Sequence, residues 1–321
     1  MLARTVLSSA VAAALLCAAC GSTPRTTPNG SGGATGTGGT AGAMGAGGGG
    51  KGGGSNPVDA AVDAVGHVSD ASGDVAPPGW RLVWSDEFQG PAGGAVDSTK
   101  WKFDLGNNNG WGNAELEDYT DRTQNAALDG NGNLVITARK EALGGQQYTS
   151  ARLLTQGKAS WTYGRFEARI QIPKGQGIWP AFWMLGDNIG TVGWPTCGEV
   201  DIMENVGREP ALIHGTMHGP GYSGGNGIGG PASLPGNGAY AAAFHVFAVE
   251  WEMNSIRWSV DGTQYFATTP ASIPAGTTWV YDHPLFIIMN VAVGGAFPGN
   301  PDGTTMFPQT MVVDYVRVFQ R

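Results

Sequence analysis

Apolar and polar residues alternate one by one through much of this 321-residue chain. In residues 163–173 an apolar side chain stands at every second position from Phe166 to Ile172, between charged or polar neighbours. The side chains of a β-strand point alternately to its two faces, so this pattern is typical of a strand with one buried face. Comparable apolar or β-branched runs occupy residues 134–138, 246–251, 255–260, 263–267, 285–291 and 311–319.

The segments between these runs favour an antiparallel arrangement. Asp261-Gly262 stands between two of the predicted strands, where an Asp-Gly pair is a strong signal for a two-residue β-hairpin. Only residues 239–244 look helical, and this segment is short. The sequence therefore predicts an all-β fold, an antiparallel β-sandwich, rather than a (β/α)8 barrel, which would need eight amphipathic helices.

The first twenty residues form a different pattern. Arg4 precedes an apolar run at residues 11–17 and two small residues, which is the order of a secretory signal peptide. Residues 17–20, CAAC, resemble the lipobox of bacterial lipoproteins, although Cys17 stands where leucine is usual. This resemblance implies export, acylation of Cys20 and a lipid anchor at the bacterial cell envelope. The alternative is cleavage near Ala19 and a freely soluble extracellular product.

Composition divides the rest of the chain in two. Residues 21–78 consist mainly of Gly, Thr, Ser, Ala and Pro, so we expect a flexible linker. All eleven tryptophans lie from Trp80 onward, which places one folded domain at residues 79–321. Of the three cysteines only Cys197 lies in this domain, so we expect no disulfide there. The formal net charge of −8 argues against a nucleic-acid partner and favours a neutral ligand, and we expect a monomer.

Three acidic residues crowd into residues 198–205, GEVDIMEN. On a strand, Glu199 and Asp201 point to one face, while Val200 points to the other. Strict alternation would put Glu204 on the wrong side. One extra residue bulging from the strand, most simply Met203, returns Glu204 to the face of the other two acids.

Crowded carboxyl groups separate in pKa, so that one stays ionised while another keeps its proton near neutral pH. A retaining glycosidase needs such a pair, an anionic nucleophile and a protonated acid about 5–5.5 Å apart. The alternative for these acids is a solvated acidic edge or a cation site.

This acidic strand and seven further motifs resemble glycoside hydrolase family 16, in its laminarinase-like branch. The resemblance covers about residues 80–321. The motifs are WSDEF at 84–88, WGNAEL at 111–116, YGRFE at 163–167, GIWPAFWM at 177–184, GTMH at 215–218, NVAVGG at 290–295 and DYVRV at 314–318. The resemblance implies a jelly-roll sandwich with an open concave cleft, in agreement with the alternation. It also implies endo-hydrolysis of 1,3-β-glucan such as laminarin, with or without tolerance of mixed 1,3-1,4 linkages.

The resemblance also implies a role for each acid. Glu199 would be the nucleophile, Asp201 its helper and Glu204 the acid/base, with no cofactor for catalysis. Family members that lack the extra residue at Met203 include lichenases and xyloglucan-active enzymes, whereas those that have it include 1,3-β-glucanases, agarases and carrageenases. A carrageenase should offer a cationic cleft, and this chain is acidic.

Aromatic rings pack against the C–H faces of sugars, so Trp179, Trp183 and Trp194, on either side of the acidic strand, are candidate platforms. The alternative for a tryptophan is core packing.

Further candidates for substrate binding follow from the resemblance. Trp111, Asn113 and Glu115 lie in a polar loop where the family places cleft-lining residues. Arg152 stands where the family has a cleft-facing arginine, and its alternative is a surface salt bridge. His218 ends a predicted strand near the acids and could hydrogen-bond the acid/base or the leaving sugar.

Three oxygen donors match positions where family members hold a structural calcium ion: Glu87, the backbone carbonyl of Gly132, and Asp314. Hard oxygen ligands of this kind suit calcium. The alternative is that they are ordinary turn acids.

Two rival functions stay open. An agarase-like or transglycosylating enzyme would use the same acids and differ in cleft loops such as residues 219–238. A non-catalytic β-glucan-binding protein could share the fold, but such relatives typically lack the catalytic acids, and all three are present here.

Overall fold

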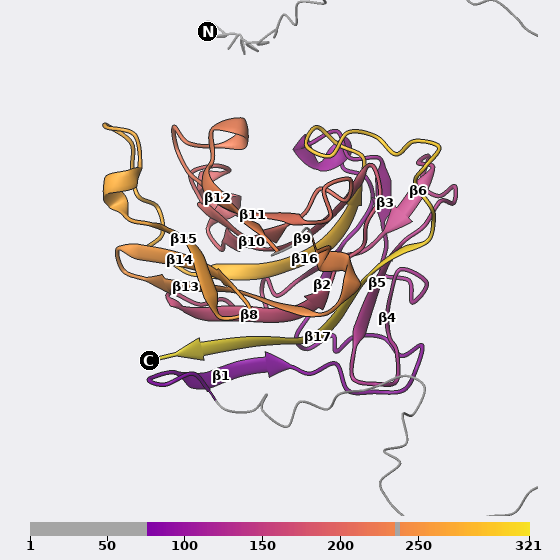
Figure 1. Cartoon of the computed structure of the whole chain (residues 1–321), viewed down its shortest axis with the longest axis horizontal. Coiled ribbons are helices and arrows are strands. Elements are labelled where there is room, and N and C mark those ends of the chain that lie inside the picture. Colours follow the sequence, from indigo (N-terminus) through magenta and orange to yellow (C-terminus); the bar gives the residue numbers. More distant parts are fainter. Residues whose placement is uncertain (1–75, 235–237) are drawn as a thin grey trace, which may run out of the picture. The chain divides into compact units, whose positions relative to one another are not determined.

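The computed structural model describes residues 76–234 and 238–321 (Figure 1). The predicted signal peptide, Cys20 and all but the last three residues of the predicted linker lie outside the described residues. Two large antiparallel sheets lie face to face, as the alternation predicts (Figure 1).

The first sheet, the lower layer in Figure 1, has eight strands. In spatial order its path is β15 (Thr263–Thr268), β14 (Ser255–Val260), β13 (His245–Glu252), β8 (Gly164–Gln171), β17 (Gln309–Gln320), β5 (Leu134–Ala138) and β4 (Ala126–Leu128). β8 follows one edge of β17, and the other edge pairs first with β5 and then with β1 (Arg81–Asp86).

The second sheet, the upper layer, has seven strands. Their order is β12 (Ile228–Ser233), β11 (Leu212–His218), β10 (Glu199–Glu204), β9 (Ile178–Gly186), β16 (Leu285–Val293), β7 (Arg152–Leu154) and β2 (Lys102–Asp104). A short parallel pair, β3 (Glu117–Tyr119) and β6 (Tyr148–Ser150), stands beside them.

The predicted strands are all present with nearly the same bounds. The hairpin between β14 and β15 is also confirmed, since Asp261 and Gly262 both have positive φ, 50° and 75°, as a type I′ turn requires.

The helical prediction for residues 239–244 is only partly right. The structure has a single 3-10 turn there, η4 (Tyr240–Ala242), and a four-residue helix that was not predicted, α1 (Ile189–Val192). The other short turns are η1 (Gly110–Gly112), η2 (Gly224–Asn226) and η5 (Pro270–Ser272). None of the helices described is long and apolar enough to span a membrane.

The core lies between the sheets, and β16 shows how the upper sheet is covered on both faces. Leu285, Ile287 and Met289 belong to the main core, whereas Phe286 and Ile288 belong to a smaller cluster that also contains Cys197, Leu154 and Leu185. Every residue of β16 is consequently buried. Each large apolar side chain buried in this way stabilises the fold by about 1.5–3 kcal/mol.

Candidate active site

The three acids of β10 meet because this strand carries a β-bulge. Asp201 pairs with Trp183 of β9, and the next pair joins Met203 to Phe182, so Ile202 has no partner on that side. On the β11 side the register also shifts, between Asp201 and Glu204. The bulge was expected at Met203. In the structure it spans Ile202 and Met203, and the β9 register makes Ile202 the extra residue.

The bulge sorts the side chains of β10 between two environments. Val200, Ile202 and Met203 are buried in the main core. Glu199, Asp201 and Glu204 line a pocket on the outer face of the upper sheet. The structure thus brings all three predicted acids to one pocket.

The opposite sheet holds the bulge in place. Trp258 of β14 is fully buried, and its indole N–H donates a hydrogen bond of 2.8 Å to the backbone carbonyl of Asp201. A bulge disrupts the ladder of backbone hydrogen bonds locally, so a donor from another layer stabilises a carbonyl at that point. Trp258 therefore links the bulge to the core.

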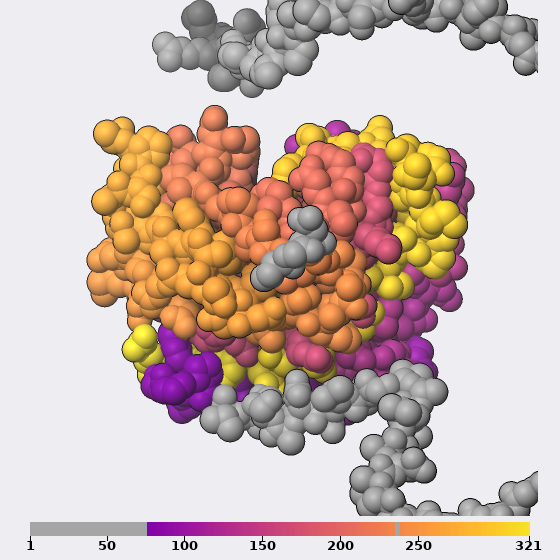
Figure 2. Space-filling view, in the orientation of Figure 1, coloured from indigo at the N-terminus to yellow at the C-terminus, as the bar shows by residue number. Residues whose placement is uncertain are grey.

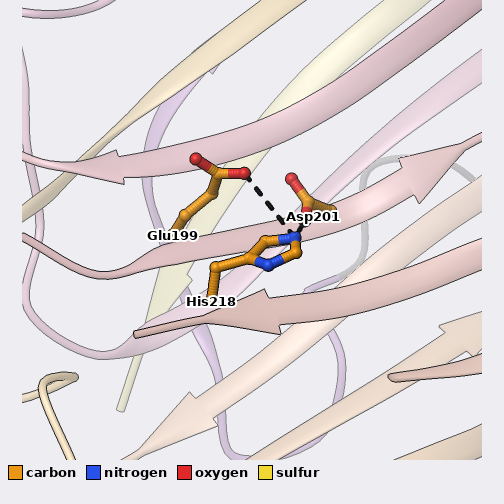
Figure 3. Close-up of side chains that lie close together, drawn as sticks. All are labelled: Glu199, Asp201 and His218. Atoms are coloured by element: carbon orange, nitrogen blue, oxygen red, sulfur yellow. Dashed lines mark ion pairs between the residues drawn. The ribbon is translucent and has the colours of Figure 1, made fainter. Parts of the chain in front are cut away.

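Glu199 and Asp201 share a histidine neighbour. His218, opposite Glu199 in the register of β11, has Nε2 3.0 Å from Asp201 Oδ2 and 3.8 Å from Glu199 Oε1 (Figure 3). Trp194, which is 49% exposed, donates its indole N–H to Glu199 Oε2 at 2.9 Å. His218 was expected to hydrogen-bond either the acid/base or the leaving sugar. The structure places it at the opposite end of β10 from Glu204, so no contact with the acid/base forms, and the contact with a sugar stays a prediction.

Burial raises the pKa of all three acids. Burial first, and then the charge of Asp201, raise the pKa of Glu199 to about 8, while His218, Trp194 and Arg152 oppose that rise. Burial raises the pKa of Asp201 to about 8, and a hydrogen bond with Glu199 opposes this.

Glu204 is the acid best suited to keep a proton. Burial and then the charges of Asp201 and Glu199 raise its pKa well above the usual value, although the indole of Trp179 donates to its Oε1 at 3.0 Å. Glu199 has more donors and cations around it and is better suited to hold a negative charge. The arrangement can therefore supply an anion and an acid to one substrate.

Arg152 of β7 lies between two indole rings in the pocket. Its guanidinium carbon is 4.8 Å from the ring centres of both Trp111 and Trp183, and its Nε is 3.1 Å from Asp104 Oδ2. Arg152 thus lines the cleft, and the ion pair that it forms with Asp104 is not a surface salt bridge, since the arginine is buried.

A chain of hydrogen bonds fixes the wall of this pocket. Trp183 donates to Asn290 Oδ1 at 2.8 Å, Asn290 donates to the Tyr119 hydroxyl at 3.0 Å, and Tyr119 donates to Glu115 Oε2 at 3.0 Å. Asn113 donates to the other oxygen of Glu115 at 3.2 Å. The predicted loop residues Asn113 and Glu115 thus lie in the pocket wall and orient an indole.

The predicted calcium ligands lie where β17 changes partner. β17 pairs with β5 up to residue 313 and with β1 from residue 316, so Gly132, just before β5, and Glu87, just after β1, lie beside Asp314. The register thus brings the three residues to one part of the sheet, and their oxygen donors are of the kind that calcium prefers. Each carboxylate also has an arginine partner: Arg317 donates to both oxygens of Glu87, at 3.0 and 2.8 Å, and Arg169 donates to Asp314 at 2.7 Å.

A different set of donors lies in the pocket itself. Glu199, Asp201 and His218 offer ligand atoms within 4.8 Å of one another, the one such group in residues 76–234 and 238–321. Carboxylates combined with an imidazole suit a transition-metal ion better than calcium. This group does not include any of the three predicted calcium ligands.

Sequence reasoning missed several residues of the cleft. Asn290 begins the motif at 290–295, so that motif could have identified it. Thr216, which lines an adjoining pocket, lies within the motif at 215–218 and could have been identified in the same way. His214 and Phe297 line that pocket too and carry no local signal, since a single aromatic residue has no spacing that marks a site.

Comparisons with known proteins agree with this geometry. A family model described as "Glycosyl hydrolases family 16" matches residues 115–317. The β-glucanase of Rhodothermus marinus is 47% identical over 253 residues, which cover 76% of this chain and 86% of that protein. The laminarinase catalytic domain of Thermotoga maritima MSB8 has a TM-score of 0.72 and 50% identity, covering 75% of this chain and 98% of that one. A mutant of a non-specific endo-β-1,3(4)-glucanase has a TM-score of 0.70 and 39% identity, covering 77% and 97%.

The bond from Trp258 to the bulge can be tested with a matched pair of variants. Trp258→Phe removes the donor to the carbonyl of Asp201, whereas Trp279→Phe removes an indole N–H that is buried without a partner. An unsatisfied buried carbonyl costs about 1–3 kcal/mol, so denaturant unfolding should show Trp258→Phe to be less stable than Trp279→Phe by about that amount. Equal losses in the two variants would show that the indole bond does not hold the bulge.

The raised pKa of Glu204 makes stability depend on pH. The stability it contributes is complete below its pKa in the unfolded chain, about 4.3, and is lost as pH rises through the higher folded pKa. The side chain introduced by Glu204→Gln cannot ionise, so the melting temperature of the variant relative to the native protein should rise between pH 4 and pH 8. The rise should be about 2–4 °C for each kcal/mol of unfolding free energy that the native protein loses over this range.

Glu141→Gln is the control for this measurement. Hydrogen bonds from Thr149 and Arg122 lower the pKa of Glu141, so its stabilising effect is present above the unfolded pKa and is lost as pH falls. The relative melting temperature of Glu141→Gln should therefore fall as pH rises. The same slope in both variants would contradict the raised pKa of Glu204.

Proposed function

Because the chain belongs to glycosyl hydrolases family 16, we propose that it is a retaining endo-β-glucanase of the laminarinase type, which hydrolyses internal 1,3-β-D-glucosidic bonds by double displacement. The observation that carries this proposal is the bulged strand β10, which presents Glu199, Asp201 and Glu204 to one pocket lined with indole rings.

In the first step, the Glu199 carboxylate attacks the anomeric carbon while Glu204 transfers its proton to the glycosidic oxygen. The bond between that carbon and the oxygen breaks, and the leaving sugar departs with the proton. In the second step, Glu204, now a carboxylate, takes a proton from water, and the water oxygen displaces Glu199 from the anomeric carbon. Asp201 hydrogen-bonds Glu199 and orients it.

A neutral glucan is the substrate that best fits the pocket. Indole rings of Trp179, Trp183 and Trp194 can pack against sugar rings, and Arg152, Asn113 and Glu115 offer polar contacts to hydroxyl groups. Tolerance of mixed 1,3-1,4 linkages is part of the proposal, supported by the similarity to the non-specific endo-β-1,3(4)-glucanase. The similarity to a β-glucanase and a laminarinase favours this activity over an agarase-like one, and the presence of all three acids favours it over a purely binding role.

We also propose that calcium stabilises the sandwich at Glu87, the carbonyl of Gly132 and Asp314. The register, which brings the three residues to the region where β17 changes partner from β5 to β1, supports this. Bound calcium would supply positive charge where β17 changes partner and would replace arginine contacts of the two carboxylates. Export and anchoring through an acylated Cys20 also belong to the proposal, and rest on the sequence of the first twenty residues.

The mechanism is tested first at the nucleophile. Glu199→Ala should lower the turnover of laminarin on the order of 10⁴- to 10⁶-fold, because no group remains to form the covalent intermediate. Added azide should restore turnover of a β-glycosyl fluoride and give a product of inverted configuration, detected by NMR.

The native protein supplies the control. Its early products from laminarin should keep the β-configuration, and α-anomers would overturn the retaining mechanism. Laminarin should be cleaved faster than lichenan, and agarose should not be cleaved. Rapid cleavage of agarose with no action on laminarin would favour the agarase-like alternative.

Calcium removal tests the metal proposal. Dialysis of calcium-loaded protein against EDTA should lower the melting temperature by about 5–10 °C, because an ion that binds only the native state stabilises it. Glu87→Gln and Asp314→Asn should reduce this shift, whereas Asp282→Asn, a change at an exposed acid elsewhere, should retain it. An identical melting curve with and without EDTA would remove calcium from the proposal.

A further inference from the structure

The cleft continues beyond the acids into a second compartment on the side of β11 and β12. This compartment shares Glu199 and Glu204 with the first pocket, and Ala296 and Phe297, which follow β16, form its other wall. The upper rim of the molecule is notched between an orange-red wall and a yellow wall, as Figure 2 shows. The two compartments therefore meet at the acids.

Phe297 is held in this wall by two other rings. Its ring centre is 5.7 Å from that of Trp179 and 5.4 Å from that of His214, and both contacts are close to perpendicular. The side chain is nevertheless 40% exposed. A large apolar ring that is fixed in position and left partly open to a cleft is suited to contact a ligand.

Part of this compartment is lined by residues without side chains. Gly224, Gly225, Gly227 and Gly229 line it. A Cβ added at Gly227 would lie 2.4 Å from the ring of His218, and one added at Gly229 would lie 2.3 Å from a backbone oxygen. A side chain at either position would collide with residues of β11, so glycine is required where this segment lies close to that strand.

We propose that Phe297, braced by His214, is the platform for the glucosyl unit on the leaving-group side of the scissile bond, an inference that rests on the proposed function. The register pairs His214 with Glu204, and Trp179, which contacts Phe297, donates to Glu204. These rings thus surround the acid that protonates the departing sugar.

The other compartment suits the sugar units that stay attached to Glu199. Arg152, Asn290 and Glu115 line that compartment and not this one, and all three can bond to sugar hydroxyl groups. Among the described residues, no lysine or arginine lines the compartment of Phe297. A neutral sugar ring that binds by stacking and leaves quickly fits it better than an anionic one.

The test compares two substrates, of which only one places a sugar in the leaving group. Laminarin places a sugar in the proposed subsite, whereas a β-glycosyl fluoride of a 1,3-linked glucotriose leaves it empty. Phe297→Ala should lower kcat/KM on laminarin about tenfold and change that on the fluoride less than about twofold. It should also abolish transfer of the glycosyl group to an added 1,3-linked glucobiose acceptor, and Phe297→Trp should restore both properties.

Met253→Ala is the control, since Met253 is an exposed apolar residue outside both compartments. It should leave both substrates and the transfer reaction unchanged. Equal losses on laminarin and the fluoride with Phe297→Ala, or no loss on either, would overturn the platform. If the native protein cleaved neither substrate, the proposed function would fail instead, so the two failures are distinguishable.

Discussion

The bulge in β10 is the constraint on which the rest of the site depends. A strand with regular alternation would direct Glu204 into the core, where an acid without a partner is strongly unfavourable. The extra residue lets Ile202 and Met203 both enter the core and returns Glu204 to the cleft. One inserted residue therefore lets the same strand direct its apolar side chains to the core and its acids to the cleft.

Three acids on one short strand destabilise the fold, and hydrogen bonds from neighbouring side chains offset part of this cost. Burial raises the pKa of each acid, and neighbouring negative charges raise the pKa of Glu199 and Glu204 further, so the folded protein holds protons that the unfolded chain would release. Indole N–H groups of Trp179 and Trp194 bond to Glu204 and Glu199 from the cleft side. The raised pKa of Glu204 disfavours folding at higher pH, and the same raised pKa keeps Glu204 protonated for the reaction.

The sequence predicted the sandwich well because alternation reports directly which face of a strand is buried. Residues 134–138 and 255–260 became β5 and β14 with the bounds expected from their pattern. Alternation could also show that Glu204 needs a bulge, but it could not place the bulge, because Ile202 and Met203 are equally apolar and the partner strands decide the register. Contacts such as that of His218 with Asp201 depend on the same register and were not predictable in detail.

The two sides of the cleft differ in how their walls are formed: one is fixed by hydrogen bonds between side chains, and the other contains several glycines. This difference fits an enzyme that cleaves within a chain. On the β9–β16 side, hydrogen bonds from Glu115 through Tyr119 and Asn290 fix an indole in place, which favours precise positioning of the sugar that reacts. On the β11–β12 side, glycines line part of the compartment, and neither lysine nor arginine lines it among the described residues. A product held there mainly by stacking has few bonds to break, so it can leave before water attacks the intermediate, or be replaced by an acceptor sugar.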